Sequence, residues 1–501
     1  MTSPALPQPH PASVPQRPFL DDLFGALWPE NDLTARPRYV AAALGAGLLA
    51  AVVLPFRDAG LGTTLVLGVV CAVVASADRR LRTPYHLLTA VLCALLLATA
   101  AVRDADWIVA LCLLATFAVG VGVLAEGRSL PGLVASGLAV PLAALRGLPW
   151  LGRSLTTTRG SASWAPVVRT TGLTVLLVLV FGLLFASADA LFASWASAVV
   201  PDLTLDTVFL RAFVTLAVGG VTLSGVYVAL NPPQVERIAL PAGQPVRRPY
   251  EWFVPIGLVT ALFAVFVVAQ LTVMFGGHAY LRRTTGLTYA EYVHQGFGQL
   301  TVTTVLTLGV VAVASRKAPR SSGREMLPRL LLGALCVLTL VVVASALHRM
   351  DVYEEAYGFT RLRLLVSVFE GWLGLVVLLV MAAGISRRGG WVPRAALLSG
   401  ATALLALAAL NPDAYIARHN VERFEETGKV DAVYLAGLSG DAVPVLVSSG
   451  INRGCLPSVV ADDDWLEWNL GRQRALDALG GTGSTGGTGS STTLADCRSR
   501  P

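Results

Sequence analysis

The chain has 501 residues, of which 54% are hydrophobic and 14% are charged, and its formal net charge is +6. Soluble domains carry about 25% charged residues, so this composition excludes an ordinary water-soluble protein and indicates a chain that lies mostly in a lipid bilayer. The positive charge, nearly all arginine, falls in short loops between apolar runs, which argues against nucleic acid as a partner.

Eleven apolar runs are long enough, or nearly so, to cross a bilayer, which takes about 20 residues of helix. Residues 1–38 precede them; they are rich in proline and polar residues, so we expect a cytoplasmic, mostly disordered segment. The runs predict an all-α, polytopic transmembrane helix bundle over residues 39–410. The predicted spans are residues 39–54, 61–77, 86–102, 107–125, 167–187, 207–230, 252–276, 297–315, 327–347, 362–385 and 391–410.

Residues 129–151 are also apolar, but they contain Pro131, Pro141, Pro149 and Arg146. A twelfth span here would reverse the orientation of every later span and would place arginine-rich loops outside. We therefore interpret this segment as an amphipathic or re-entrant stretch at the inner face, and a spanning helix is the alternative.

Lysine and arginine are divided unequally between alternate loops, with about 22 on one side of the predicted membrane and about 7 on the other. Cytoplasmic loops of membrane proteins carry the excess of these residues. The distribution therefore predicts a cytoplasmic amino terminus and an extracytoplasmic carboxy terminus.

The chain becomes polar, with scattered apolar residues, after the last span. Residues 411–478 predict a small extracytoplasmic helical subdomain on the outer mouth of the bundle, with a break between two helices at residues 439–441. Residues 479–501 are rich in glycine, serine and threonine and predict a flexible tail. Cys455 and Cys497 both fall on this oxidising side, so they are a candidate disulfide.

The second half of the chain contains five distinctive short sequences: VAQL at 268–271, LTYAEY at 287–292, AYGFTRLR at 356–363, NPD at 411–413 and DAVP at 441–444. Together, over about residues 189–444, they resemble a bacterial multi-spanning family known as a domain of unknown function, of the 4153/4173 type. The resemblance implies a protein of the bacterial plasma (inner) membrane. It implies no particular activity, because the family has no established one.

The predicted topology places these strings at the outer ends of the last five spans, in their loops or in the tail. Irregular backbone at a membrane surface is buried in protein or lines a cavity, so an outward-facing polar vestibule is the candidate site. No catalytic residue is assigned. The candidate lining residues are Asp189, Arg211, Gln270, Tyr289, Glu291, Arg349, Glu354, Tyr357, Arg361, Arg363, Glu370, Asn411 and Asp413.

Glu370 is the most informative of these residues, because it lies about eight residues, or roughly 12 Å, inside the tenth span. An ionisable side chain at that depth marks a functional position by default. It either binds a proton, an ion or a cationic group in a polar pocket, or forms a structural ion pair with Arg211, Arg361 or Arg363.

No metal site and no cofactor are predicted. His278, His294, His348 and His419 are all expected on the outer side near carboxylates, but they show neither a two-histidine helical spacing nor a His-Glu-x-x-His motif. The glycine-rich tail lacks the lysine of a phosphate-binding loop. We interpret these histidines as residues of surface loops.

Three functions fit this pattern. The first is a membrane scaffold or sensor, whose partners are the lipid bilayer and an extracytoplasmic protein or envelope component. The second is a secondary transporter or carrier that uses Glu370, although no internal repeat supports it. The third is an enzyme acting on lipid-linked or envelope material at the outer leaflet, and the absence of a recognisable catalytic spacing makes an enzyme the least favoured.

Overall fold

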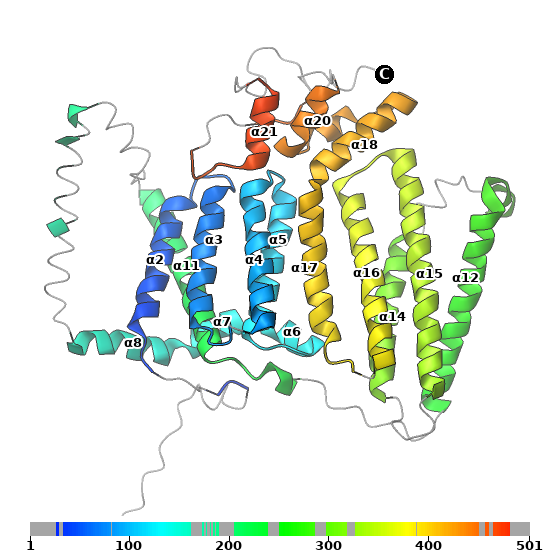
Figure 1. The fold of residues 1–501 in the computed structure, drawn as a ribbon, viewed down its shortest axis with the longest axis horizontal. Helices are drawn as coiled ribbons and strands as arrows, with labels where there is room; N and C mark the ends of the chain where they lie inside the picture. Colours follow the sequence, from blue (N-terminus) through cyan, green and yellow to red (C-terminus); the bar gives the residue numbers. More distant parts are fainter. Residues whose placement is uncertain are drawn as a thin grey trace, which may run out of the picture.

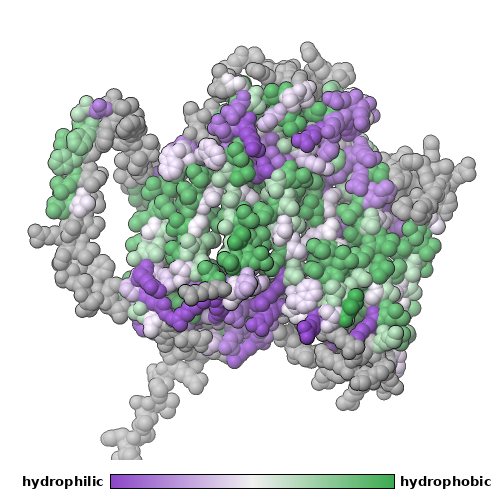
Figure 2. Space-filling model, viewed as in Figure 1, coloured by the Kyte–Doolittle hydropathy of each residue, from purple (hydrophilic) through white to green (hydrophobic). Residues whose placement is uncertain are grey.

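The computed structural model describes residues 27–29, 34–81, 83–161, 205–238, 250–285, 297–317, 326–386, 388–449, 456–459 and 464–480, with isolated residues between 173 and 189. All regular structure in these residues is helical, so the predicted all-α fold is confirmed. Figure 2 shows a hydrophobic belt around the middle of the molecule, with hydrophilic residues gathered at its two ends. This distribution is that of an integral membrane protein.

Eight helices are long and apolar enough to cross a membrane, and two shorter apolar helices stand beside them in the part of the chain that the structure describes (Figure 1). The long helices are α4 (Pro84–Val102), α5 (Asp106–Leu124), α11 (Leu205–Leu230), α12 (Tyr250–Thr285), α14 (Phe297–Lys317), α15 (Met326–Tyr357), α16 (Arg361–Ser386) and α17 (Val392–Leu410). The shorter ones are α2 (Pro37–Val53) and α3 (Leu61–Ala77).

Ten of the eleven predicted spans correspond to these helices, and the fifth, residues 167–187, lies largely outside the described residues. The helices α12 and α15 run nine or ten residues past the predicted ends of their spans, to Thr285 and Tyr357. Hydropathy marks only the apolar part of a helix, so their polar extensions toward one end of the bundle were not predicted.

The bundle has two halves joined by α17. In the first half α11 packs against α2 and α3, and α4 packs against α3 and α5; in the second half α15 packs against α12, α14 and α16. The helix α17 contacts α4 and α5 on one side and α16 on the other. A buried core that includes Leu96, Ile108, Leu364 and Leu407 crosses this junction. The second half is therefore held to the first mainly through α17 and the residues that follow it.

Residues 129–151 contribute to three short helices, α6 (Leu130–Ser136), α7 (Ala139–Arg146) and α8 (Leu148–Ser161), at one end of the bundle (Figure 1). Gly137 and Gly147 separate them. Trp150 is buried against Tyr227 of α11, with ring centroids 6.1 Å apart. At seven, eight and fourteen residues, these helices are too short to cross the bilayer.

The tail subdomain lies at the other end of the bundle, called the tail end below (Figure 1). It consists of α18 (Pro412–Thr427), α19 (Ala432–Ala436), a short 3₁₀ helix η2 (Gly440–Ala442), α20 (Val443–Ser448) and α21 (Leu470–Ala478). The 3₁₀ helix occupies the position where a break between two helices is predicted.

Candidate functional site

The turn from α17 into the tail subdomain is made by Asn411. Its φ of 59° lies in the left-handed region, which asparagine adopts more readily than most residues. Pro412 follows at the first position of α18, where its missing N–H costs no hydrogen bond. This turn folds α18 back over the bundle and brings Asp413 above α5 and α16.

Asp413 is the first of two buried carboxylates that hold the subdomain down, and it is 0% exposed. Arg361, at the start of α16, donates to both of its oxygens, from Nε at 3.0 Å and from Nη2 at 2.5 Å. Trp107 Nε1 of α5 donates to Oδ1 at 3.1 Å, and the backbone N–H of Ser439 donates to Oδ2 at 2.8 Å. One carboxylate thus joins α5, α16, α18 and the turn before η2.

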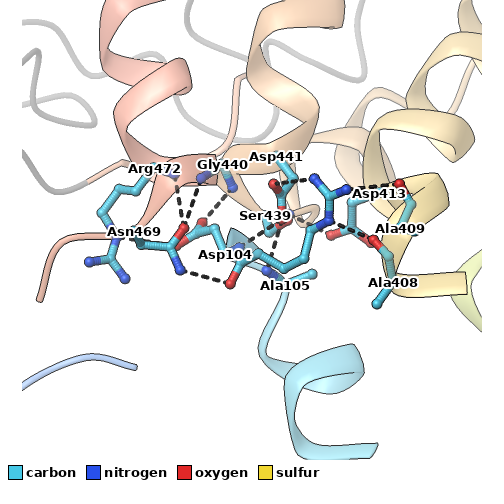
Figure 3. Close-up of polar contacts among 12 residues, drawn as sticks. Asp104, Ala105, Ala408, Ala409, Asp413, Ser439, Gly440, Asp441, Asn469 and Arg472 are labelled. Carbon is cyan, nitrogen blue, oxygen red and sulfur yellow. Dashed lines mark hydrogen bonds and ion pairs between the residues drawn. The ribbon is translucent and has the colours of Figure 1, made fainter. Parts of the chain in front are cut away.

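Asp441 is the second buried carboxylate, and Figure 3 shows it facing the connection between α4 and α5. Its Oδ2 accepts from the backbone N–H groups of Asp104 at 2.8 Å and Ala105 at 3.1 Å. In return, the Asp104 carboxylate accepts from the backbone N–H of Gly440 at 2.7 Å. Arg103 Nη1 lies 3.9 Å from Asp441 Oδ1. The bonds are reciprocal, so they fix the subdomain in one register on the bundle.

Arg103 also ties α4 to α17. Its Nε donates to the carbonyl oxygen of Ala408 at 2.6 Å, and its Nη2 donates to that of Ala409 at 2.9 Å. The last carbonyl groups of a helix have no partner within it and attract cations. Arg103, at the end of the neighbouring helix α4, therefore supplies hydrogen bonds to the last carbonyl groups of α17.

The final helix α21 completes the contact (Figure 3). Asn469 caps α21 by accepting from the N–H groups of Gly471 and Arg472, and its Nδ2 donates to the carbonyl oxygens of Ala100 and Arg103. Arg472 Nε donates to Asp104 Oδ1 at 3.1 Å. A side chain at Gly471 would collide with the Asp441 carboxylate. We call Arg103, Asp104, Arg361, Asp413, Asp441, Asn469 and Arg472 the tail latch.

A further contact joins the subdomain to the connection between α2 and α3. Arg57 Nη2 lies 2.9 Å from Asp464 Oδ2, and the N–H of Leu61 donates to the carbonyl oxygen of Trp468 at 2.9 Å. The subdomain therefore touches the α2–α3, α4–α5 and α15–α16 connections at the tail end. These contacts hold the ends of the helices together at the tail end. No group of three or more potential metal ligands is found in the described part of the chain.

The pKa values of the two latch carboxylates, Asp413 and Asp441, are shifted in opposite directions. Burial works to raise the pKa of Asp413, but the hydrogen bonds and the charge of Arg361 outweigh it and hold this pKa below its usual range. Burial raises the pKa of Asp441 to about 6, although the N–H groups and Arg103 partly oppose it. Asp413 therefore stays ionised, whereas Asp441 changes charge near pH 6.

We expect docking of the subdomain to weaken as the pH rises through about 6. The pKa of Asp441 is higher in the docked state than in the undocked one. The stabilisation that Asp441 provides is therefore fully present at a pH below the usual aspartate pKa, and it is lost as the pH rises above about 6. Limited proteolysis of the full-length protein between about pH 5 and pH 8 measures this, and cleavage should rise several-fold. Asp441→Asn keeps the acceptor oxygen and should cleave at a rate independent of pH; the same pH profile in both proteins would contradict the assignment.

A second polar group, the intramembrane cluster, lies inside the second half of the bundle. Gln270 Oε1 of α12 accepts from Ser345 Oγ at 3.2 Å and from Arg349 Nη2 at 2.5 Å, both on α15. Glu370 of α16 is 0% exposed, and its Oε1 accepts from the Thr304 hydroxyl of α14 at 3.5 Å. These contacts link α12 to α15 and, separately, α14 to α16.

The ion pair that one alternative predicts for Glu370 is not formed, because the three candidate arginines bind elsewhere. Each lies near a helix end, where it binds carbonyl oxygens or a carboxylate. The partners of Arg211, Arg361 and Arg363 are, in that order, the carbonyl oxygen of Ala51, the carboxylate of Asp413, and the carbonyl oxygens of Tyr357 and Gly358.

The structure distributes the predicted vestibule residues over several places. Arg361, Asn411 and Asp413 belong to the tail latch or adjoin it, and Gln270, Arg349 and Glu370 belong to the intramembrane cluster. Glu354 is buried near the tail end of α15, whereas Tyr357 and Asp189 are exposed. Tyr289, Glu291, Cys455 and Cys497 lie outside the described residues.

No sequence pattern points to several of the latch residues. Arg103 and Asp104 lie in a connection of only three residues between two apolar helices, followed by Trp107. Charged residues in so short a connection must find partners at the membrane surface. Their position between two apolar helices could therefore have indicated a contact site. Nothing comparable marks Asn469 and Arg472, which lie in an ordinary polar segment.

The end opposite the tail carries two adjoining hollows of about 290 and 470 Å³, both lined by Pro232. The acidic groups around the larger one are bound within the chain. Glu236 accepts from the N–H groups of Arg128 at 2.6 Å and Ser129 at 3.0 Å, and Glu126 pairs with Arg80. Burial works to raise the pKa of Glu236, but these hydrogen bonds lower it overall. The carboxylate therefore stays ionised and fixes the start of α6.

Together these features define a polytopic helical membrane protein whose carboxy-terminal subdomain is clamped to the bundle. The family model described as Domain of unknown function (DUF4153) matches residues 90–449, most of the chain, and the protein belongs to this family. The match contains α5, α17 and both latch carboxylates. No curated protein and no solved structure gives a significant match.

Proposed function

We propose that this protein is a scaffold or sensor of the bacterial plasma (inner) membrane, with a cytoplasmic amino terminus and an extracytoplasmic tail subdomain that meets a protein or envelope partner. The observation that carries the proposal is the tail latch, in which two buried carboxylates fix the subdomain to both halves of the bundle. A subdomain fixed in this way moves with the helices beneath it. It can therefore present a defined surface or report a rearrangement of the bundle.

The orientation is supported by the loop charges and by aromatic residues at the tail end. The predicted loops on the side opposite the tail carry about 22 lysine and arginine residues, and those on the tail side carry about 7, which favours the tail side as the outer side. Trp465 is 66% exposed and Phe56 is 70% exposed, and both lie where the subdomain meets the α2–α3 connection. Exposed aromatic side chains at this level suit the headgroup region of a bilayer.

The partner surface in this proposal is the exposed face of α18. Asp413, Ala417 and Val421 lie on its buried face, at the spacing of an amphipathic helix. Glu422, Glu425 and Glu426 are exposed. Arg418 is exposed as well, so the face keeps a net negative charge and favours a basic partner surface.

Complementation of a deletion strain tests the proposal with the full-length protein. Glu425→Lys with Glu426→Lys reverses the charge of the exposed face and leaves the latch intact, so we expect a loss of complementation at normal membrane abundance. Glu370→Gln, the matched change inside the bundle, should complement. Full complementation by the α18 variant would contradict the scaffold or sensor function.

A secondary carrier is the second candidate, and one observation favours it. Glu370 is fully buried in the second half of the bundle, and among the described residues its contacts are hydroxyl groups rather than cations. A carboxyl group without a cationic partner is energetically costly inside a membrane. Such groups therefore mark functional positions, and proton relays are one example. In the same experiment this candidate predicts the reverse result, with Glu370→Gln failing to complement.

A further inference from the structure

The surroundings of Glu370 are defined by two antiparallel helices. The short connection 358–360 joins α15 to α16, and Gly374 of α16 packs against Val343 of α15. Nine residues separate Glu370 from the start of α16, about 14 Å along the helix. The same distance along α15 from its end reaches His348, beside Arg349. Glu370 and Arg349 therefore lie at the same depth, well below the tail end.

Two buried oxygens at this depth have no hydrogen-bond partner among the described residues. They are Glu370 Oε2 and Ser367 Oγ. Residues three apart lie on the same face of a helix, so both point from α16 in similar directions. On α14, Thr304 donates to Glu370 Oε1, and Thr301 also faces the carboxyl group. The site thus combines one carboxyl group with several hydroxyl groups and retains unused acceptor capacity.

The charges near the site are few. Arg349 of α15 is the charged side chain at this depth in the described part of the second half, and it binds Gln270. His348 is exposed, and the contacts of α14 with the carboxyl group in the described residues come from Thr301 and Thr304. A buried carboxyl group without an ion pair is less costly to bury when it carries a proton.

We propose that Glu370, with Ser367 and Thr304, forms a proton-binding site enclosed in the second half of the bundle. The proton moves between the Glu370 carboxyl oxygen and water at the tail end, and no other bond forms or breaks. A polar stripe on α15 leads that way: Ser345, Arg349 and Tyr353 follow one another at four-residue intervals. Arg363 stands over the Tyr353 ring at 4.3 Å, where the stripe ends.

This inference deepens the carrier candidate, and it is tested without measuring transport. Dicyclohexylcarbodiimide enters membranes and reacts with a carboxyl group that carries a proton: the oxygen bonds to the central carbon, and the proton goes to nitrogen. Purified full-length protein in lipid vesicles is treated with this reagent, digested and analysed by mass spectrometry. We expect the reagent on Glu370, with a rate that falls about fivefold or more from about pH 5 to pH 9.

Variants and ions make the test specific. Glu370→Gln should abolish the modification of its peptide, whereas Glu354→Gln, the matched change at a buried glutamate of α15, should leave it unchanged. In addition, alkaline pH should destabilise the native protein to heat more than it destabilises Glu370→Gln, which retains the pH-dependent contribution of Asp441. An unmodified Glu370 in folded protein, or protection by sodium chloride that choline chloride does not give, would overturn the proton site. Modification without any transport activity would leave the site standing and remove only the carrier function.

Discussion

Replacing Asp413 by alanine is expected to lower the free energy of unfolding by about 3–5 kcal/mol and to release the tail subdomain. The carboxylate is completely buried and accepts four hydrogen bonds, two of them from Arg361. Without it, the Arg361 guanidinium loses its partner while half-buried, and Trp107 and Ser439 lose their acceptor. Breaking one side of a buried ion pair costs more than the pair contributes, because the other charge stays buried.

Thermal unfolding of the detergent-solubilised protein, together with protease cleavage after α17, measures this effect. Glu425→Ala is the matched control on the same helix; its side chain is exposed, so the change should be within about 0.5 kcal/mol. The double variant Asp413→Ala with Arg361→Ala should be less unstable than the two single effects added together. Strict additivity, or a stability of Asp413→Ala equal to that of the control, would show that the latch does not hold the subdomain.

Most of the transmembrane architecture was predictable, because the bilayer fixes how long an apolar helix must be. Eight spans follow from that constraint alone, and the shorter apolar helices α2 and α3 match two more of the predicted runs. Prolines and Arg146 likewise separated residues 129–151 from the spans, since these residues interrupt a long apolar helix. What hydropathy cannot report is where a helix ends once it has left the lipid, which is why the ends of α12 and α15 were missed.

The contacts of the site were less predictable, for two physical reasons. The bond from the Asp104 N–H to Asp441 joins positions 337 residues apart, and neither neighbourhood contains a pattern that names the other. Hydropathy also gives the depth of a residue along a helix but not the direction in which its side chain points. It therefore placed Glu370 deep in a span but did not decide between a polar pocket and an ion pair, and the three arginines named for that pair are bound at helix ends.

Replacing Gly47 by alanine is expected to destabilise the first half of the bundle by about 1–3 kcal/mol. Gly47 lies on the face of α2 that meets α11, between Ala43 and Ala50, and a Cβ atom there would collide with the backbone carbonyl of Thr215. Because the obstacle is backbone, no change of side-chain rotamer relieves the overlap, and the two helices must separate. Close approach through small residues is a main source of helix association in membranes, where no hydrophobic effect drives it.

Gly45 provides a matched control two residues away on the same helix. A Cβ atom at Gly45 meets nothing within 4 Å, so Gly45→Ala should stabilise α2 by up to about 1 kcal/mol through its higher helix propensity. The two substitutions change composition identically but should shift the unfolding temperature in opposite directions. Cross-linking between cysteines placed on α2 and α11 should slow only in Gly47→Ala. Equal shifts of the same sign would mean that propensity outweighs the packing of α2 on α11.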